Sequence, residues 1–123
     1  MNTYLAARFP RRAEMEGYVP FFKNLGFDVT ARWVFGGEDG LTRSEIAEID
    51  LEDVADADCL ILFTHDYGSL QPGGGRFVEF GYALALGKRV IVIGDYENVF
   101  THHPDVEVYP DLKVFARCVS SAA

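Results

Sequence analysis

Residues 59–64 read CLILFT, a continuous apolar run of the kind that forms a central strand of a parallel sheet. A second run, RVIVI at residues 89–93, has the same character. Between them, residues 76–86 have the pattern of a helix, which Gly87 ends. Strand, helix and strand in this order predict two parallel strands joined by a crossover helix, so the sequence indicates the α/β class.

The flanking sequence continues this alternation. Towards the N-terminus we expect a strand at 3–7, a helix around 15–22 that Pro20 kinks or divides, and a strand at 27–34. Thr42 and Glu45 resemble a capping box that begins a helix, and Asp50 is a candidate cap for a second short helix at 51–57. A strand at 106–109 and a helix from about Leu112 close the chain. The prediction is one domain over residues 1–123, a three-layer α/β/α fold with a five-stranded parallel sheet of flavodoxin-like (Rossmann-like) type.

Composition limits the classes of partner. The 123 residues suffice for one buried core, and 11 Lys and Arg against 19 Asp and Glu give a net charge of −8, which repels polymeric nucleic acid. No apolar run approaches the roughly 20 residues that span a bilayer, and the N-terminus lacks a secretory pattern, so we expect a cytoplasmic protein without a membrane partner. Arg8, Arg11 and Arg12 concentrate positive charge near the start, which suits a small anion.

Ligands of parallel sheets bind beyond the carboxyl ends of the strands, which selects the loops after residues 7, 34, 64 and 93. Gly73, Gly74 and Gly75 lead into the predicted helix at 76–86, whose first turn is expected to hold Glu79. Glycines let a backbone approach a ligand, and the helix start favours negative charge. Glu79 is therefore either an ionised carboxylate that attacks the anomeric carbon of a sugar or a common helix-starting residue.

Three segments together resemble the nucleoside 2-deoxyribosyltransferase family and its relatives that hydrolyse nucleoside 5′-monophosphates. They are TYLAA at 3–7, DLEDVADADCLILF at 50–63, and GGRFVEFGYALALGKRVIVIG at 74–94 with the following ENVF. The most specific part is VEFGYALALGKR, because that family places its nucleophilic glutamate in an E-x-G-x-A helix start.

The resemblance implies roles for four residues. Glu79 matches the nucleophile, Asp50 the carboxylate that handles the base or its proton, and Tyr4 the tyrosine near the nucleophile. Asn98 lies where the family often supplies a sugar-binding residue to the neighbouring subunit, so the resemblance implies a homodimer or a dimer-built oligomer with shared sites. From the residues alone, Asp50 could equally cap a helix, Tyr4 could belong to the core and Asn98 could be a turn residue.

The sequence departs from the family at Gly73, where some transferases have a second base-contacting aspartate. Relatives that hydrolyse nucleoside 5′-monophosphates also lack it and hold the phosphate with glycine-rich and basic loops. The candidates for that role here are Arg8, Arg11, Arg12, Gly73, Gly74, Gly75 and Arg76. The same arginines could equally be a solvated helix start.

Three functional hypotheses follow. The first is transfer of the sugar of a nucleoside, or of its 5′-monophosphate, through glycosyl-Glu79 to another base. The second is hydrolysis of a nucleoside 5′-monophosphate. The third is a non-catalytic nucleotide-binding domain, because a fold alone does not fix a function. The glycosidic chemistry requires no cofactor, and we assign no metal to His102 and His103. Trp33 and Phe9 are candidates to stack on a base or to belong to the core.

Overall fold

The structure is a computed structural model that describes residues 1–64 and 74–121. Within these residues one parallel sheet has the strand order β2-β1-β3-β4-β5, which is the flavodoxin-like order. The strands are β1 (Asn2–Ala6), β2 (Asp28–Val29), β3 (Cys59–Phe63), β4 (Arg89–Ile93) and β5 (Val106–Tyr109). The predicted fold class is therefore confirmed.

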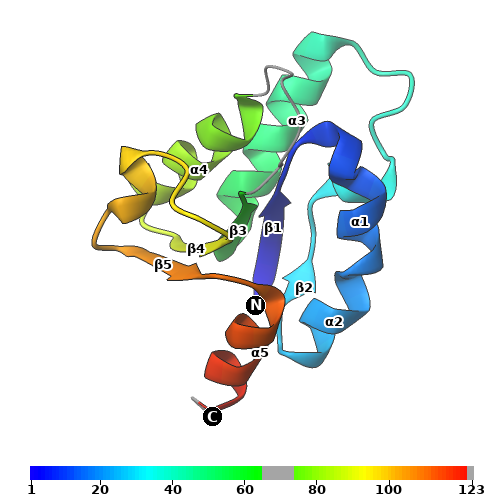
Figure 1. Cartoon of the computed structure of the whole chain (residues 1–123). Helices are drawn as coiled ribbons and strands as arrows, with labels where there is room; N and C mark the ends of the chain where they lie inside the picture. Colours follow the sequence, from blue (N-terminus) through cyan, green and yellow to red (C-terminus); the bar gives the residue numbers. More distant parts are fainter. Residues whose placement is uncertain (65–73, 122–123) are drawn as a thin grey trace.

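Helices cover both faces of this sheet (Figure 1). On one face α2 and α5 meet, where the rings of Phe22 and Phe115 lie 5.9 Å apart, and on the other face α3 packs against α4. The α-helices are α1 (Arg12–Gly17), α2 (Val19–Asn24), α3 (Arg43–Asp56), α4 (Gly75–Ala85) and α5 (Leu112–Ser121), and the 3₁₀ helices are η1 (Phe9–Arg11), η2 (Arg32–Phe35) and η3 (Val99–His102). None of these helices is long and apolar enough to cross a membrane.

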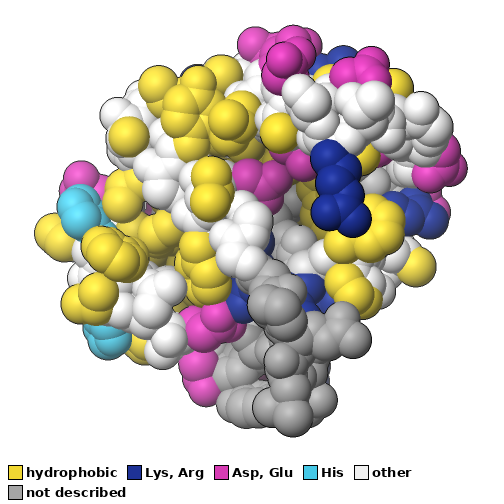
Figure 2. All heavy atoms as spheres, turned by 90° about the horizontal axis from the view of Figure 1, so that it is seen from above, with side chains coloured by type: hydrophobic (Ala, Val, Ile, Leu, Met, Phe, Trp, Pro, Cys, Tyr) yellow, Lys and Arg dark blue, Asp and Glu magenta, His cyan; other side chains and the backbone are white. Residues whose placement is uncertain are grey.

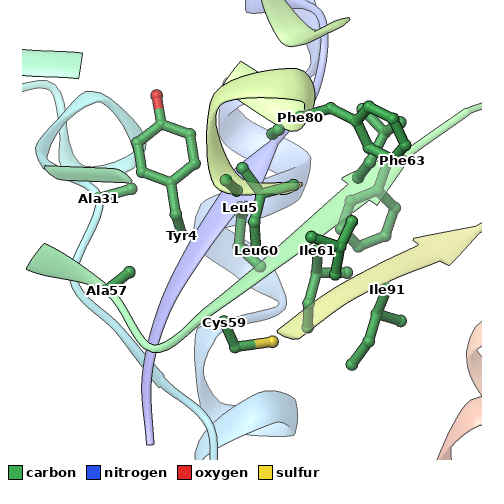
Figure 3. Packing of buried hydrophobic residues seen from close by; sticks show 14 of the residues in the cluster. Tyr4, Leu5, Ala31, Ala57, Cys59, Leu60, Ile61, Phe63, Phe80 and Ile91 are labelled. Atoms are coloured by element: carbon green, nitrogen blue, oxygen red, sulfur yellow. The ribbon is translucent and has the colours of Figure 1, made fainter. Parts of the chain in front are cut away.

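The core lies on the two central strands. Every residue of β3 is buried, and so is β4 beyond its first residue, as their apolar sequences predict. Tyr4 pairs in register with Leu60 and is fully buried, yet Figure 3 shows its hydroxyl pointing away from the surrounding apolar side chains. The Tyr4 hydroxyl on β1 thus reaches from the core to Glu79, in the N-terminal half of α4.

The predicted helix around 15–22 is divided, as Pro20 indicates. α1 ends at Gly17 and α2 begins at Val19, with the proline at the second position of α2. A proline is tolerated there because the first amides of a helix have no intrahelical acceptor.

The predicted strand at 27–34 is wrong in its second half. Only Asp28 and Val29 pair with β1, and residues 32–35 form η2 instead. The Trp33 indole donates to the Leu5 carbonyl oxygen at 2.8 Å. Asp53 accepts hydrogen bonds from the backbone and guanidinium of Arg32 at 2.8–3.2 Å. These contacts with distant residues hold residues 32–35 in a 3₁₀ helix and not in a strand of the sheet.

The capping box of Thr42 and Glu45 is confirmed, with both reciprocal hydrogen bonds present at 3.0 and 3.1 Å. The second short helix at 51–57 is wrong, because α3 continues unbroken from Arg43 to Asp56. No glycine or proline interrupts that stretch. Asp50 is therefore not a helix cap, and its carboxyl group is left for another role.

Candidate active site

A cleft of about 460 Å³ opens beyond the carboxyl ends of the strands, a size usual for small-molecule sites. Its walls come from the segment after β1, the turn after η2, the middle of α3 and the start of α4. The strand order reverses between β1 and β3: α2, which follows β1, and α4, which follows β3, cover opposite faces of the sheet, and such a switch point is where these folds bind ligands. Figure 2 looks onto this end of the molecule, where acidic and basic side chains surround a central hollow.

Glu79 lies in the cleft and accepts a hydrogen bond from the Tyr4 hydroxyl. Because α4 begins at Gly75, Glu79 occupies the second turn rather than the predicted first turn. Burial raises the pKa of Glu79 to about 7, the hydrogen bond from Tyr4 lowers it, and the charge of Glu38 raises it. Burial therefore opposes the help that a helix start gives to an ionised carboxylate, and the net pKa lies above the ordinary value of a glutamate.

Tyr4 lies on β1 and is completely buried, and its hydroxyl donates a hydrogen bond to Glu79. Burial and the negative charges of Glu79 and Asp50 raise the pKa of Tyr4 far above its ordinary value. Its hydroxyl therefore keeps its proton and remains a hydrogen-bond donor to Glu79. The structure brings these two sequence-predicted residues together.

Asp50 reaches the same cleft from the middle of α3. Burial raises its pKa to about 8, with further contributions from a hydrogen bond with Glu38 and from the charge of Glu79. Apart from this contact with Glu38, its Oδ1 atom is buried without a hydrogen-bond partner in the described part of the chain. A carboxyl group in this state is protonated near neutral pH and can act as an acid.

Glu38 is a site residue that the sequence reasoning missed. It follows η2 in the turn that begins at Gly36, whose φ of +76° is left-handed and favours glycine. Its Oε2 atom is also buried without a partner among the described residues. The loop after residue 34 was selected as ligand-facing, but no motif or spacing marked this glutamate.

Three of the four predicted phosphate-binding arginines line the cleft: Arg8, Arg12 and Arg76. The Arg76 guanidinium pairs with Glu97 at 2.5 Å and lies over the Phe77 ring. Arg12 donates to the Val34 carbonyl oxygen at 2.9 Å.

Arg11 does not line the cleft. Its guanidinium bonds both carboxylate oxygens of Glu14 at 2.7 and 2.9 Å and the carbonyl oxygen of Thr64 at 3.1 Å. It also lies over the Phe63 ring, so it ties α1 to the end of β3.

The two described glycines at the start of α4, Gly74 and Gly75, leave open space. A Cβ atom added at Gly74 or Gly75 would meet nothing within 4 Å, and Gly75 lines the cleft. Gly73 lies outside the described residues. The room above the start of α4 can therefore accommodate a ligand group beside the first amides of the helix.

Asn98 does not line the cleft of the single chain. It caps η3 by accepting a hydrogen bond from the Phe100 amide at 2.9 Å. The two candidates for stacking do line the cleft: Phe9, which is 70% exposed, and Trp33, which is mostly buried.

No protein-family model and no curated protein sequence matches the chain. Solved structures do match, and two of them cover 99–100% of the chain. The CMP N-glycosidase BcmB of Clostridium botulinum has a TM-score of 0.66 and 18% identity, with 100% of both chains covered. A 2-deoxyribosyltransferase from Leishmania mexicana has a TM-score of 0.73 and 16% identity, with 99% of both chains covered. The chain shares the fold of these enzymes.

This likeness confirms the resemblance inferred from the sequence and the fold it implied. At such identities it establishes the fold alone, and the chemistry depends on the cleft. Among residues 1–64 and 74–121, no group of three or more His, Cys, Asp and Glu side chains is arranged to hold a metal ion.

Proposed function

We propose that the chain cleaves the N-glycosidic bond of a nucleoside or a nucleoside 5′-monophosphate, with Glu79 as the nucleophile. The observation that carries the proposal is the arrangement of Glu79, held by the Tyr4 hydroxyl, in one cleft with the protonatable Asp50. A nucleophile and an acid on one small cleft are what retaining glycosyl transfer requires. Both structures of the same fold are named for glycosidic chemistry of this kind, one acting on CMP.

The two carboxyl groups have pKa values suited to different roles. The pKa of Glu79 is about 7 and that of Asp50 about 8, so ionised Glu79 and protonated Asp50 coexist between these values. Because the groups interact, both values belong to the coupled pair. Glu79 attacks C1′ while Asp50 donates its proton to the departing base, directly or through water. Tyr4 positions the nucleophile and keeps its own proton.

The glycosyl-Glu79 intermediate then transfers the sugar with retention of configuration. Transfer to a second nucleobase makes the protein a nucleoside deoxyribosyltransferase, and transfer to water makes it an N-glycosidase. One observation favours a 5′-monophosphate as substrate: Arg8, Arg12 and Arg76 line the cleft beside the amides at the start of α4. An acidic chain needs such a local concentration of positive charge to hold a phosphate.

The test is incubation of the protein with single nucleosides and their 5′-monophosphates, each with and without a second free base, followed by chromatography of the bases. We expect release of base from a monophosphate, and its loss by more than a hundredfold in Glu79→Gln. Consumption that depends on the second base identifies the transferase. Tight nucleotide binding with no turnover of any substrate would establish instead the non-catalytic binding domain.

We also propose that the protein works as a homodimer or a dimer-built oligomer. Val78, Tyr82 and Leu86 form an exposed apolar row along α4, and Val99 and Phe100 are 71% and 66% exposed next to Asn98. Pairing of such surfaces would bring Asn98 toward a second cleft. Sedimentation should give twice the chain mass or a multiple of it, and Val78→Glu should lower it. A monomer with full activity at the same concentration would refute this.

A further inference from the structure

Glu38 lines the cleft, but the proposed reaction has so far given it no role. It enters the cleft from the turn after η2, and its side chain lies within hydrogen-bonding range of the Asp50 side chain on α3. Apart from this contact between the two carboxyl groups, Glu38 Oε2 and Asp50 Oδ1 are buried and find no hydrogen-bond partner in the described residues. A polar ligand in this cleft would therefore meet two carboxyl groups whose oxygens still need partners.

Two carboxyl groups this close do not both ionise readily, because their charges repel each other strongly in a partly buried place. The pair therefore tends to keep one proton. In this cleft burial and the hydrogen bond with Glu38 raise the pKa of Asp50 to about 8, which puts the proton on the pair at neutral pH. That one proton either bridges Asp50 and Glu38 or turns toward a ligand, and when it turns the pair offers the ligand one O–H donor and, beside it, carboxylate oxygens that accept.

We propose that Glu38 and Asp50 together recognise the base, and that they select bases with an exocyclic amino group next to an unprotonated ring nitrogen. The inference rests on the proposed function, because it assigns the substrate class of the same cleft. The amino group donates to an oxygen of Glu38, and the ring nitrogen accepts from the protonated oxygen of Asp50. Cytosine and adenine have such an edge.

Bases with a carbonyl in place of the amino group present the opposite pattern. Uracil and hypoxanthine place a carbonyl oxygen against the Glu38 oxygen and a ring N–H against the Asp50 proton. Acceptor then faces acceptor and donor faces donor, and the buried groups stay unsatisfied. A site built to bond one pattern rejects the other by leaving its own polar groups unpaired.

The same arrangement serves bond cleavage. As the bond between C1′ and the base breaks, its electron pair moves into the base and the Asp50 proton passes to the ring nitrogen, so the base leaves neutral. A Glu79 oxygen forms the new bond to C1′. In the second step the attacking water or base loses a proton to Asp50, Glu79 departs with the electron pair of its ester bond, and the carboxyl pair with Glu38 regains its one proton.

The experiment measures binding separately from turnover. In a Glu79→Gln background, calorimetric titration compares CMP with UMP and AMP with IMP, in ribose and 2′-deoxyribose forms. We expect the amino-bearing member of at least one pair to bind on the order of tenfold or more tightly, as for one or two hydrogen bonds to a charged group. Cleavage by the chain with Glu79 intact is measured on the same nucleotides.

Glu38→Gln is the decisive variant, because it keeps the shape and replaces an acceptor oxygen by an N–H donor. The preference should then disappear or reverse toward the carbonyl-bearing base. Glu48→Gln, an exposed position on the same helix as Asp50, is the matched control and should leave the preference unchanged. Asp50→Asn still offers a donor to the ring nitrogen, so it should retain the preference but lose the pH dependence of binding.

The outcomes separate this inference from the proposed function. Cleavage without discrimination between the members of a pair, or discrimination that survives Glu38→Gln in a folded variant, would overturn the role of Glu38 and leave the glycosidic activity standing. Discrimination in binding that Glu38→Gln removes, without cleavage by the chain that retains Glu79, would support the recognition pair and overturn the activity. If no nucleotide binds, both fail.

Discussion

Glu79→Gln should make the protein more stable at alkaline pH while removing its proposed activity. The substitution keeps the shape of the side chain and an oxygen that accepts from the Tyr4 hydroxyl, but it removes a carboxyl group whose pKa is raised from 4.5 to about 7, chiefly by burial. Folding therefore favours the protonated form. The stability this provides is complete below pH 4.5 and is lost as the pH rises through about 7.

The size of the effect follows from the pKa difference. Each tenfold change in proton affinity corresponds to about 1.36 kcal/mol, so ionising Glu79 in the folded chain costs up to about 3 kcal/mol of unfolding free energy. Between pH 5 and pH 8.5 the gain in stability from Glu79→Gln should grow by about 2 kcal/mol, because part of the loss precedes pH 5 and coupling to Asp50 spreads the titration.

Urea denaturation of both proteins at pH 5.0 and pH 8.5, followed by circular dichroism, measures this difference directly. The comparison removes the pH effects of groups that do not interact with Glu79, because those effects are common to both proteins, and it leaves the effects of Glu79 and of its coupling to Asp50. Glu48→Gln, which changes an exposed glutamate, should show no pH-dependent gain. If Glu79→Gln increases the free energy of unfolding by the same amount at both pH values, ionisation of Glu79 does not destabilise the folded protein and the reasoning is refuted.

Three further predictions concern the reaction. Tyr4→Phe should raise the pKa of Glu79, because it removes the hydrogen bond that lowers it, so the acidic limb of the pH–rate profile should move upward; an unmoved limb would contradict the positioning role. The profile of kcat/KM should be bell-shaped, rising as Glu79 ionises near pH 7 and falling as Asp50 loses its proton near pH 8, and a flat profile would exclude this acid–nucleophile pair. Arg8→Ala should lower the turnover of a monophosphate by about tenfold to a hundredfold and leave the turnover of its nucleoside unchanged. Arg43→Ala, an exposed control at the start of α3, should leave both unchanged. Equal losses on both substrates would show that Arg8 does not bind the phosphate.

Much of the fold could be predicted because its signals are local. The continuous apolar sequences of β3 and β4 predict buried strands without information from distant residues. Gly87 in the same way predicts the end of the preceding helix. The capping box of Thr42 is equally local, since it needs only four residues. The prediction of the second strand was wrong in its second half because Arg32 and Trp33 form hydrogen bonds with Asp53 and Leu5, which are distant in the sequence.

The candidate site divides in the same way. The sequence indicated Tyr4, Asp50 and Glu79 as candidate site residues, because they resemble the motifs of a known family and lie on elements that a parallel sheet brings to one end. Only the tertiary structure showed that Asp50 lies inside a continuous helix, that Glu38 stands beside it, and that Arg11 is committed to Glu14 instead of the cleft. The structure was also needed to assign the protonation of these carboxyl groups. A pKa depends on burial and on charges a few ångströms away, and the sequence alone specifies neither the burial nor the distances.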